Sequence, residues 1–228
     1  MGFSLTASYT SNGIYYYTFS ASGTCWAKCI SAGDAGGGDG RTPANGAYGG
    51  NFSGQQFAVY NGTEITINVG SGGQNDGEGN LTPGGDSSVL IGDTIKCQAP
   101  GPTTDDGFVG SVQYQGGQGG ICQAYGGGAG GTAGSGGDGG DGANDPSDGS
   151  NAPGGSGGQD DGDGVSYGGN GGSGCANDGT PNDMTAPGGS GGGGDSIEDA
   201  GQNGLDGAVF IFFEASSNIS QCSMMITT

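Results

Sequence analysis

The sequence predicts a mostly extended fold, in which stacked polyglycine II helices join a small antiparallel β part with essentially no α-helix. Six copies of the pentapeptide Gly-Gly-x-Gly-Gly begin at Gly116, Gly127, Gly136, Gly154, Gly168 and Gly188. Short runs of alternating apolar residues lie outside these copies and predict strands. No window carries apolar residues at helical spacing, and each glycine costs an α-helix about 1 kcal/mol.

A polyglycine II helix suits the pentapeptides. It has three residues per turn, a rise of about 3.1 Å and no internal hydrogen bonds, so its backbone groups need partners on neighbouring helices. In a GGxGGx register two of three edges carry no side chain, and the third presents x to solvent. The x residues are Gln118, Ala129, Asp138, Ser156, Asn170 and Ser190. The bare run Gly191 to Gly194 predicts an interior helix.

Collagen and disorder are two other interpretations of the glycine content. Collagen requires glycine at every third position and abundant proline, whereas the period here breaks and only 8 prolines occur. Disorder is the alternative, because glycine loses more backbone freedom on folding than any other residue. Hydrogen bonds between helices, at about 1 kcal/mol net each, have to offset that entropy.

Five strand-forming segments are expected. Ile14 to Phe19 is aromatic and β-branched, and Trp26 to Ser31 is predicted to be its hairpin partner. Residues 57–69 alternate on both sides of Asn61-Gly62, and residues 88–97 flank Gly92-Asp93, so each predicts a hairpin. Residues 208–214 are continuously apolar and predict a closing strand that is covered on both faces.

These segments divide the chain into three parts. Residues 1–33 form an N-terminal β-hairpin or attachment segment. Residues 34–215 form a glycine-rich polyglycine II domain with the embedded hairpins 57–69 and 88–97 and the closing strand 208–214. Residues 216–228 form a C-terminal tail.

The charge balance excludes several classes of function. Three basic residues oppose 23 acidic ones, the net charge is −20, and histidine is absent. DNA and RNA would be repelled, since their binding depends on Lys and Arg. No apolar stretch is long enough for membrane insertion. Without histidine there is no Ser-His-Asp or Cys-His arrangement, so we expect no enzyme and no cofactor.

The cysteines leave two interpretations open. They are Cys25, Cys29, Cys97, Cys122, Cys175 and Cys222. An even count in a polar chain suggests disulfides, whereas small buried hydrophobic residues are the alternative. Cys25 and Cys29 are expected on one strand, about 13 Å apart, too far to bond each other.

Calcium is the one ion worth considering. Residues 136–144 approximate a calcium-binding nonapeptide, and Asp160, Asp161 and Asp163 offer oxygen ligands. Solvated charge is the default interpretation of these carboxylates.

Polar inserts between the glycine runs are the candidate recognition loops. They are Gln98 to Phe108, Ala143 to Pro153 and Ala176 to Pro187. If the glycine helices are parallel, these inserts gather at the helix ends, where a rigid scaffold carries variable loops. The candidate contact residues are Asp145, Asp148, Asn151, Asn177, Asn182 and Met184, with Tyr114, Tyr125 and Tyr167 as possible aromatic contacts. Plain connectors are the alternative for the loops, and covers for the glycine helices are the alternative for the tyrosines.

The order of these features resembles the glycine-rich domain of bacteriophage tail-fibre proteins. The resemblance covers residues 12–214 and rests on the first glycine patch at 35–40, the strand ending ITINVGSGG at 65–73, the hairpin at 88–97 and the final strand DGAVFI at 206–211. The glycine runs are also similar to those of the distal adhesins of T-even-like phages. Those adhesins are sandwiches of polyglycine II helices with receptor-binding loops, and the resemblance implies the same architecture for this chain.

The resemblance implies an exposed, non-enzymatic virion protein, made in the host cytoplasm and carried on the virion surface. Its partners would be a host cell-surface receptor (an outer-membrane protein or a glycan) and other virion proteins. The alternative is a structural virion component, such as a head fibre, decoration or tail protein, docked through residues 216–228. An ice-binding protein would need a flat face of regularly spaced small residues, which the sequence lacks.

Overall fold

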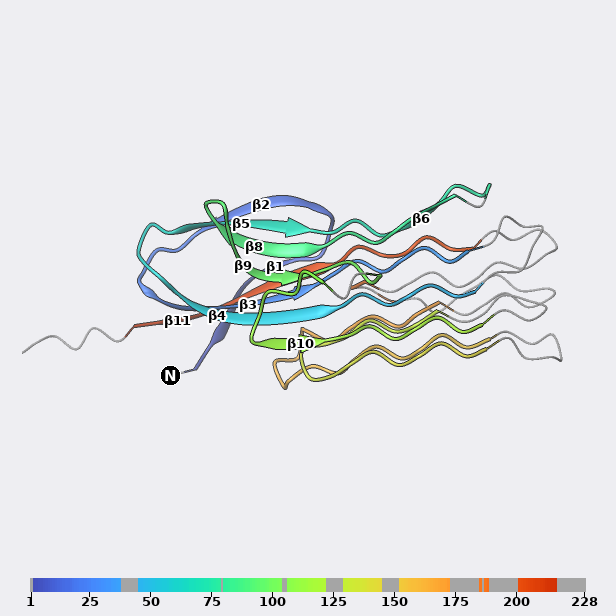
Figure 1. Ribbon diagram of the computed structural model, residues 1–228. Coiled ribbons are helices and arrows are strands. Elements are labelled where there is room, and N and C mark those ends of the chain that lie inside the picture. Colours follow the sequence, from blue (N-terminus) through green and yellow to red (C-terminus); the bar gives the residue numbers. More distant parts are fainter. Residues whose placement is uncertain are drawn as a thin grey trace, which may run out of the picture.

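The computed structural model joins an antiparallel β-sandwich at one end to a bundle of extended glycine-rich segments at the other (Figure 1). It describes residues 2–37, 45–78, 80–103, 106–121, 129–144, 152–172, 185, 187–188 and 201–216. Within these ranges there is no α-helix, and hence no helix long and apolar enough to cross a membrane.

Two sheets form the sandwich. The first contains β1 (Ser4–Tyr9), β11 (Ala208–Ala215), β3 (Gly23–Ile30), β4 (Phe52–Val59) and β10 (Val112–Tyr114), in that order. The second contains β2 (Gly13–Thr18), β5 (Glu64–Val69), β8 (Ser87–Ile91) and β9 (Thr94–Ala99). A small separate ribbon pairs β6 (Gln74–Asn75) with β7 (Leu81–Thr82).

Strand β11 lies between β1 and β3 and is covered on both faces, as its apolar sequence predicts. Val209 and Ile211 point into the core between the two sheets. Phe210 and Phe212 point to the opposite face, where they join a second apolar cluster that includes Ala133 of the glycine-rich part. This strand therefore ties the sandwich to the glycine bundle.

The hairpin expectations are confirmed at one place and wrong at two. Strands β8 and β9 pair around Gly92, whose φ of 55° suits glycine. By contrast, β2 pairs with β5, and β3 pairs with β11 and β4, so residues 12–33 do not form a hairpin and do not stand apart as a unit. Strand β5 lies where it is predicted, whereas β4 begins at Phe52, before the predicted segment, and the two strands belong to different sheets.

The turn at Asn61-Gly62 crosses from one sheet to the other. Gly62 has a φ of 83° and donates its N–H to the carbonyl of Phe19, 2.8 Å away. The N–H of Phe19 in turn donates to the carbonyl of Thr63 at 2.9 Å. Phe19 lies in the connection between β2 and β3, which also crosses between the sheets. These two hydrogen bonds therefore join the β2–β3 connection to the β4–β5 connection.

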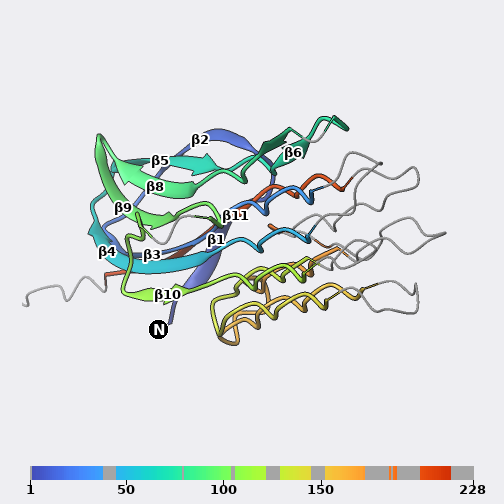
Figure 2. The same ribbon diagram turned by 45° about the vertical axis from the view of Figure 1, so that its right-hand side comes forward.

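Most strands of the sandwich continue directly into glycine-rich segments. β3 is followed by residues 31–37, β5 by 70–73 and β10 by 115–121, whereas β4 is preceded by 45–51 and β11 by 201–207. Figures 1 and 2 show these segments running side by side away from the sheets. The sheets thus set the spacing and direction of the first glycine segments.

Backbone hydrogen bonds in these segments repeat every three residues. The N–H groups of Ala129, Thr132 and Ser135 donate to carbonyls of Gly172, Gly169 and Ser166, all at 2.9 Å. The N–H groups of Gly130 and Ala133 donate to Ala47 and Gly50 on a different neighbour. A strand would return to the same neighbour every second residue, whereas polyglycine II has three residues per turn. The segments are polyglycine II helices, and we call each one a glycine helix.

The glycine helix at residues 129–135 lies in the interior of the described part of the bundle. It exchanges backbone hydrogen bonds with segments around residues 47–50, 117, 137–140, 155–158 and 166–172. All seven of its residues are buried, including Ala129, so this x residue does not face solvent as expected. Of the other x residues, Gln118, Asp138, Ser156 and Asn170 are exposed as predicted. Ser190 and the run Gly191 to Gly194 lie outside the described residues.

Candidate functional site

The described ends of the glycine helices gather at the end of the molecule opposite β1 (Figure 1). Hydrogen bonds join neighbouring helices there: Gly36 to Gln202, Gly46 to Gly120, and Ala143 to Pro153. Three seven-residue stretches, 38–44, 122–128 and 145–151, separate helices that end and begin at this place. We call it the connection end.

Most of the predicted contact residues lie outside the described residues. This applies to Asp145, Asp148, Asn151, Asn177, Asn182, Met184 and Tyr125. Asn144 and Ala152, which flank the stretch 145–151, lie next to the hydrogen bond from Ala143 to Pro153, and Gly172, which precedes the stretch 173–184, accepts the N–H of Ala129. The third insert, Gln98 to Phe108, is placed elsewhere: Gln98 pairs with Val109 in both directions, beside the sandwich.

The two described tyrosines have different surroundings. Tyr114 is half-buried in β10 and packs against Phe52, with ring centroids 6.0 Å apart, so it covers the second apolar cluster. Tyr167 is 51% exposed. It lies five residues before Gly172, about 15 Å from the connection end at the rise of a polyglycine II helix.

Side chains at the outer edge of the bundle complete the backbone hydrogen bonding. Oδ1 atoms of Asp138, Asp141 and Asn144 accept the N–H groups of Gln115, Gln118 and Ile121, each at 2.8 Å. Both series advance by three residues, so each side chain caps the same edge of the neighbouring helix. The carboxylates of Asp138 and Asp141, expected only to be solvated, therefore also accept hydrogen bonds from the backbone of the neighbouring helix.

This edge gives a prediction that separates shape from charge. Asp141→Ala removes the acceptor for the Gln118 N–H, and we expect it to lower the free energy of unfolding by about 1 kcal/mol, as at a helix N-cap. Asp141→Asn keeps Oδ1 and should change it by less than about 0.5 kcal/mol. Urea unfolding measures both variants, and an Asn variant as unstable as the Ala variant would contradict the capping role.

A buried lysine joins the sandwich to the glycine bundle. Lys28 of β3 has no exposed surface, and its Nζ contacts Asp161 Oδ1 and Asp163 Oδ2, both at 2.6 Å. The same ammonium lies 4.1 Å from the ring centroid of Trp26 and 4.8 Å from that of Phe212. Sequence reasoning missed this cluster, because the partners are 133 and 135 residues apart.

The carboxylates around Lys28 form ion pairs and accept hydrogen bonds. Burial alone would raise the pKa of Asp163, but hydrogen bonds from Lys28, Ser166 and the N–H of Val165 outweigh it and lower the pKa to about 2. Asp160 accepts the N–H groups of Gly162 and Gly164. Within the described residues no group of three or more acids or cysteines could hold a metal ion. Asp161 and Asp163 have Lys28 as their cation, and calcium binding stays a prediction.

Three cysteines lie between the two sheets. Cys25, Cys29 and Cys97 are buried free thiols in the main apolar core. Burial, and then the neighbouring Cys97, raises the pKa of Cys25 to about 12. Burial likewise raises the pKa of Cys29, whose thiol also contacts Cys97. Cys122, Cys175 and Cys222 lie outside the described residues, so the disulfide question stays open for them.

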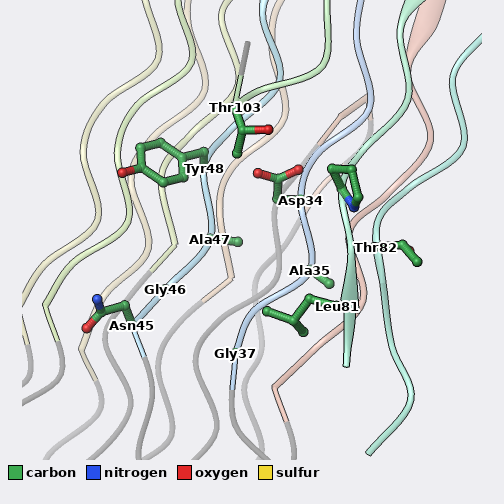
Figure 3. Close-up of a pocket in the computed structure, with 11 residues that line it drawn as sticks. Asp34, Ala35, Gly37, Asn45, Gly46, Ala47, Tyr48, Leu81, Thr82 and Thr103 are labelled. Carbon is green, nitrogen blue, oxygen red and sulfur yellow. The ribbon is translucent and has the colours of Figure 1, made fainter. Parts of the chain in front are cut away.

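A cavity of about 570 Å³ opens between the glycine helices 31–37 and 45–51 and the segment at 81–83. Figure 3 shows Asp34 and Ala35 on one of these glycine helices, Ala47 and Tyr48 on the next, and Leu81 near Ala35. Asp34 is only 7% exposed. Burial raises its pKa to about 6, although the N–H of Gly84 donates to Oδ1 at 2.7 Å.

The raised pKa of Asp34 predicts how stability depends on pH. The folded state holds this proton up to about pH 6, whereas the unfolded chain releases it near pH 3.8. Folding therefore binds a proton between these values, and the carboxylate destabilises the protein increasingly as the pH rises through 6. Asp34→Asn should raise the melting temperature at pH 7.5 and lose this advantage by pH 4. An equal gain at both pH values would contradict the assignment.

The comparisons with known proteins define the family. The model of a family described as a glycine-rich domain matches residues 10–214. Because this match covers most of the chain, the protein belongs to the glycine-rich domain family. No curated protein matches the sequence.

Proposed function

We propose that the protein is a non-enzymatic, exposed virion protein of a bacteriophage, and that it acts as a tail-fibre tip adhesin. It binds a host surface receptor through the connections between glycine helices. The observation that carries this proposal is the connection end, where the described ends of several glycine helices lie side by side and are held by backbone hydrogen bonds.

Rigidity supports the proposal. A recognition surface made of loops needs a scaffold that fixes their spacing. Here each glycine helix is held by several neighbours, and the edge helix is capped by Asp138, Asp141 and Asn144 up to the last described residues. Loop sequence can then vary without changing the lattice, which suits a protein that follows a changing receptor.

The positions of the first and last strands also fit. β1 begins, and β11 ends, at the sandwich end (Figure 1). Ser216, just after β11, donates its N–H to Ser22 at 3.0 Å. Attachment to other virion proteins at this end would leave the connection end free for a receptor, an outer-membrane protein or a glycan. The same position favours the second candidate, a structural virion component that docks through residues 216–228.

Competition with infection tests the proposal. The isolated protein is added to host cells before phage, and we expect it to bind the cells and reduce plaque number in a saturable way. A variant with Asp145, Asp148 and Asn151 replaced by Ser should lose competition. A matched control with Asp93 replaced by Asn, in the β8–β9 turn, should keep it. Absence of cell binding by the folded protein would favour the structural candidate.

A further inference from the structure

The cavity beside Asp34 combines two features that rarely occur together without a ligand. Its walls are largely apolar, formed by Ala35, Ala47, Leu81 and Pro83. A nearly buried carboxylate, Asp34, lies in the same wall. Burying a charge is costly unless a partner compensates it, so the partner of this carboxylate has to be identified.

Asp34 differs from the other acids that cap glycine helices. Asp138 and Asp141 make the same kind of contact with a backbone N–H, but they are exposed and water solvates the remaining oxygen. Among the described residues, the hydrogen bond to the Asp34 carboxylate comes from the N–H of Gly84. Among the residues that the structure describes, no basic side chain pairs with it, and both ion pairs belong to Lys28. Asp34 is also one of the residues that line the cavity.

We infer that this cavity binds a basic side chain, an ammonium or guanidinium group on an aliphatic stem, that a partner protein presents. The stem packs against Ala35, Ala47 and Leu81, and the charged head meets the carboxylate of Asp34.

Charge across the whole chain favours the same class of partner. The net charge is −20, so a basic protein surface is attracted over a long range and an acidic one is repelled. At the mouth of the cavity Leu81 is 48% and Tyr48 is 43% exposed. These side chains offer apolar contact to the backbone around an inserted lysine or arginine.

The cavity borders the connection end, where Gly37, Asn45 and Gly46 line it. The inference rests on Asp34 and the apolar lining, and not on the connections proposed to bind the receptor. Its test needs no host cells. Loss of competition with infection and loss of binding at the cavity are therefore separate results.

Titration of the full chain by two-dimensional NMR tests the inference. The probes are Nα-acetyl-lysine N-methylamide, the arginine equivalent, and the norleucine equivalent, which keeps the stem and lacks the charge. We expect saturable shifts of the amides of Asp34, Tyr48 and Gly84 with the basic probes, and at least tenfold weaker binding of norleucine. Equal binding of norleucine would overturn the inference.

Two variants and one further probe complete the design. Asp34→Asn, which keeps the acceptor for Gly84, should weaken the lysine probe at least tenfold, whereas Asp93→Asn removes the same charge far from the cavity and should not. Equal effects of the two variants would overturn the role of Asp34. Butylammonium distinguishes a protein side chain from a free amine as the ligand. If butylammonium binds more weakly than the lysine probe, the result supports a protein side chain. If it binds equally or more tightly, the result overturns the inference in favour of a free amine.

Discussion

Replacing Gly139 with alanine should lower the free energy of unfolding by about 3 kcal/mol or more, or prevent folding. A Cβ at this position would lie 1.9 Å from the carbonyl oxygen of Gly131 on the interior glycine helix. Backbone atoms cannot move aside as a flexible side chain can, so the cost reaches or exceeds the usual range for overpacking. Chemical denaturation of the purified variant measures the loss.

Gly137→Ala is the matched control for this prediction. It makes the same substitution two residues away in the same segment, where a Cβ meets nothing within 4 Å. Because alanine restricts the unfolded chain, we expect Gly137→Ala to be neutral or to stabilise by up to about 1 kcal/mol. If both variants lost the same stability, close packing of backbone against backbone would not be the reason that glycine is required.

Replacing Lys28 with methionine should lower the free energy of unfolding by about 3 kcal/mol. The change keeps an apolar stem against Trp26 and Phe212 but leaves Asp161 and Asp163 without their cation. Removing one member of a buried ion pair costs far more than the pair contributes, because the remaining charge stays desolvated. Denaturation at pH 7 compares this variant with Lys96→Met, which removes a charge from the less buried strand β9.

A second comparison isolates the electrostatic part. Adding Asp161→Asn and Asp163→Asn to Lys28→Met removes the uncompensated charges, and part of the lost stability should return. If Lys28→Met cost no more than Lys96→Met, the cluster would not be what joins the glycine bundle to the first sheet.

The sequence predicts local conformation well in this protein and long-range pairing poorly. Residues 57–69 alternate clearly, and β5 and the last residues of β4 lie where that pattern predicts, although β4 already begins at Phe52. The same pattern cannot say whether two adjacent strands pair or face each other across a core, because both arrangements bury alternate residues. Asn61-Gly62 fixes a tight turn and leaves the choice of sheet open.

Strand β1 was missed for a related reason. Ser4 to Tyr9 is mostly polar, since it is an edge strand beside β11 that buries little beyond Ala7 and Tyr9. Its neighbour supplies the apolar surface. The identity of a strand of this kind depends on a partner about 200 residues away, which local composition does not reveal.

The glycine helices were predicted because their physics depends on composition. Bare backbone needs backbone partners, and that requirement alone points to stacked polyglycine II. Position within the stack was harder to predict. Ala129 is interior because neighbouring glycine helices surround the segment at 129–135. Lys28 was overlooked because its carboxylates are distant in sequence and adjacent only once the bundle is folded.

The central claim is that backbone hydrogen bonds with a period of three build the glycine bundle. Scalar couplings measured by NMR across hydrogen bonds test it most directly. We expect couplings from the amides of Ala129, Thr132 and Ser135 to the carbonyls of Gly172, Gly169 and Ser166. Couplings that return to one neighbour at every second residue, or rapid hydrogen exchange with no couplings across 129–135, would contradict the account.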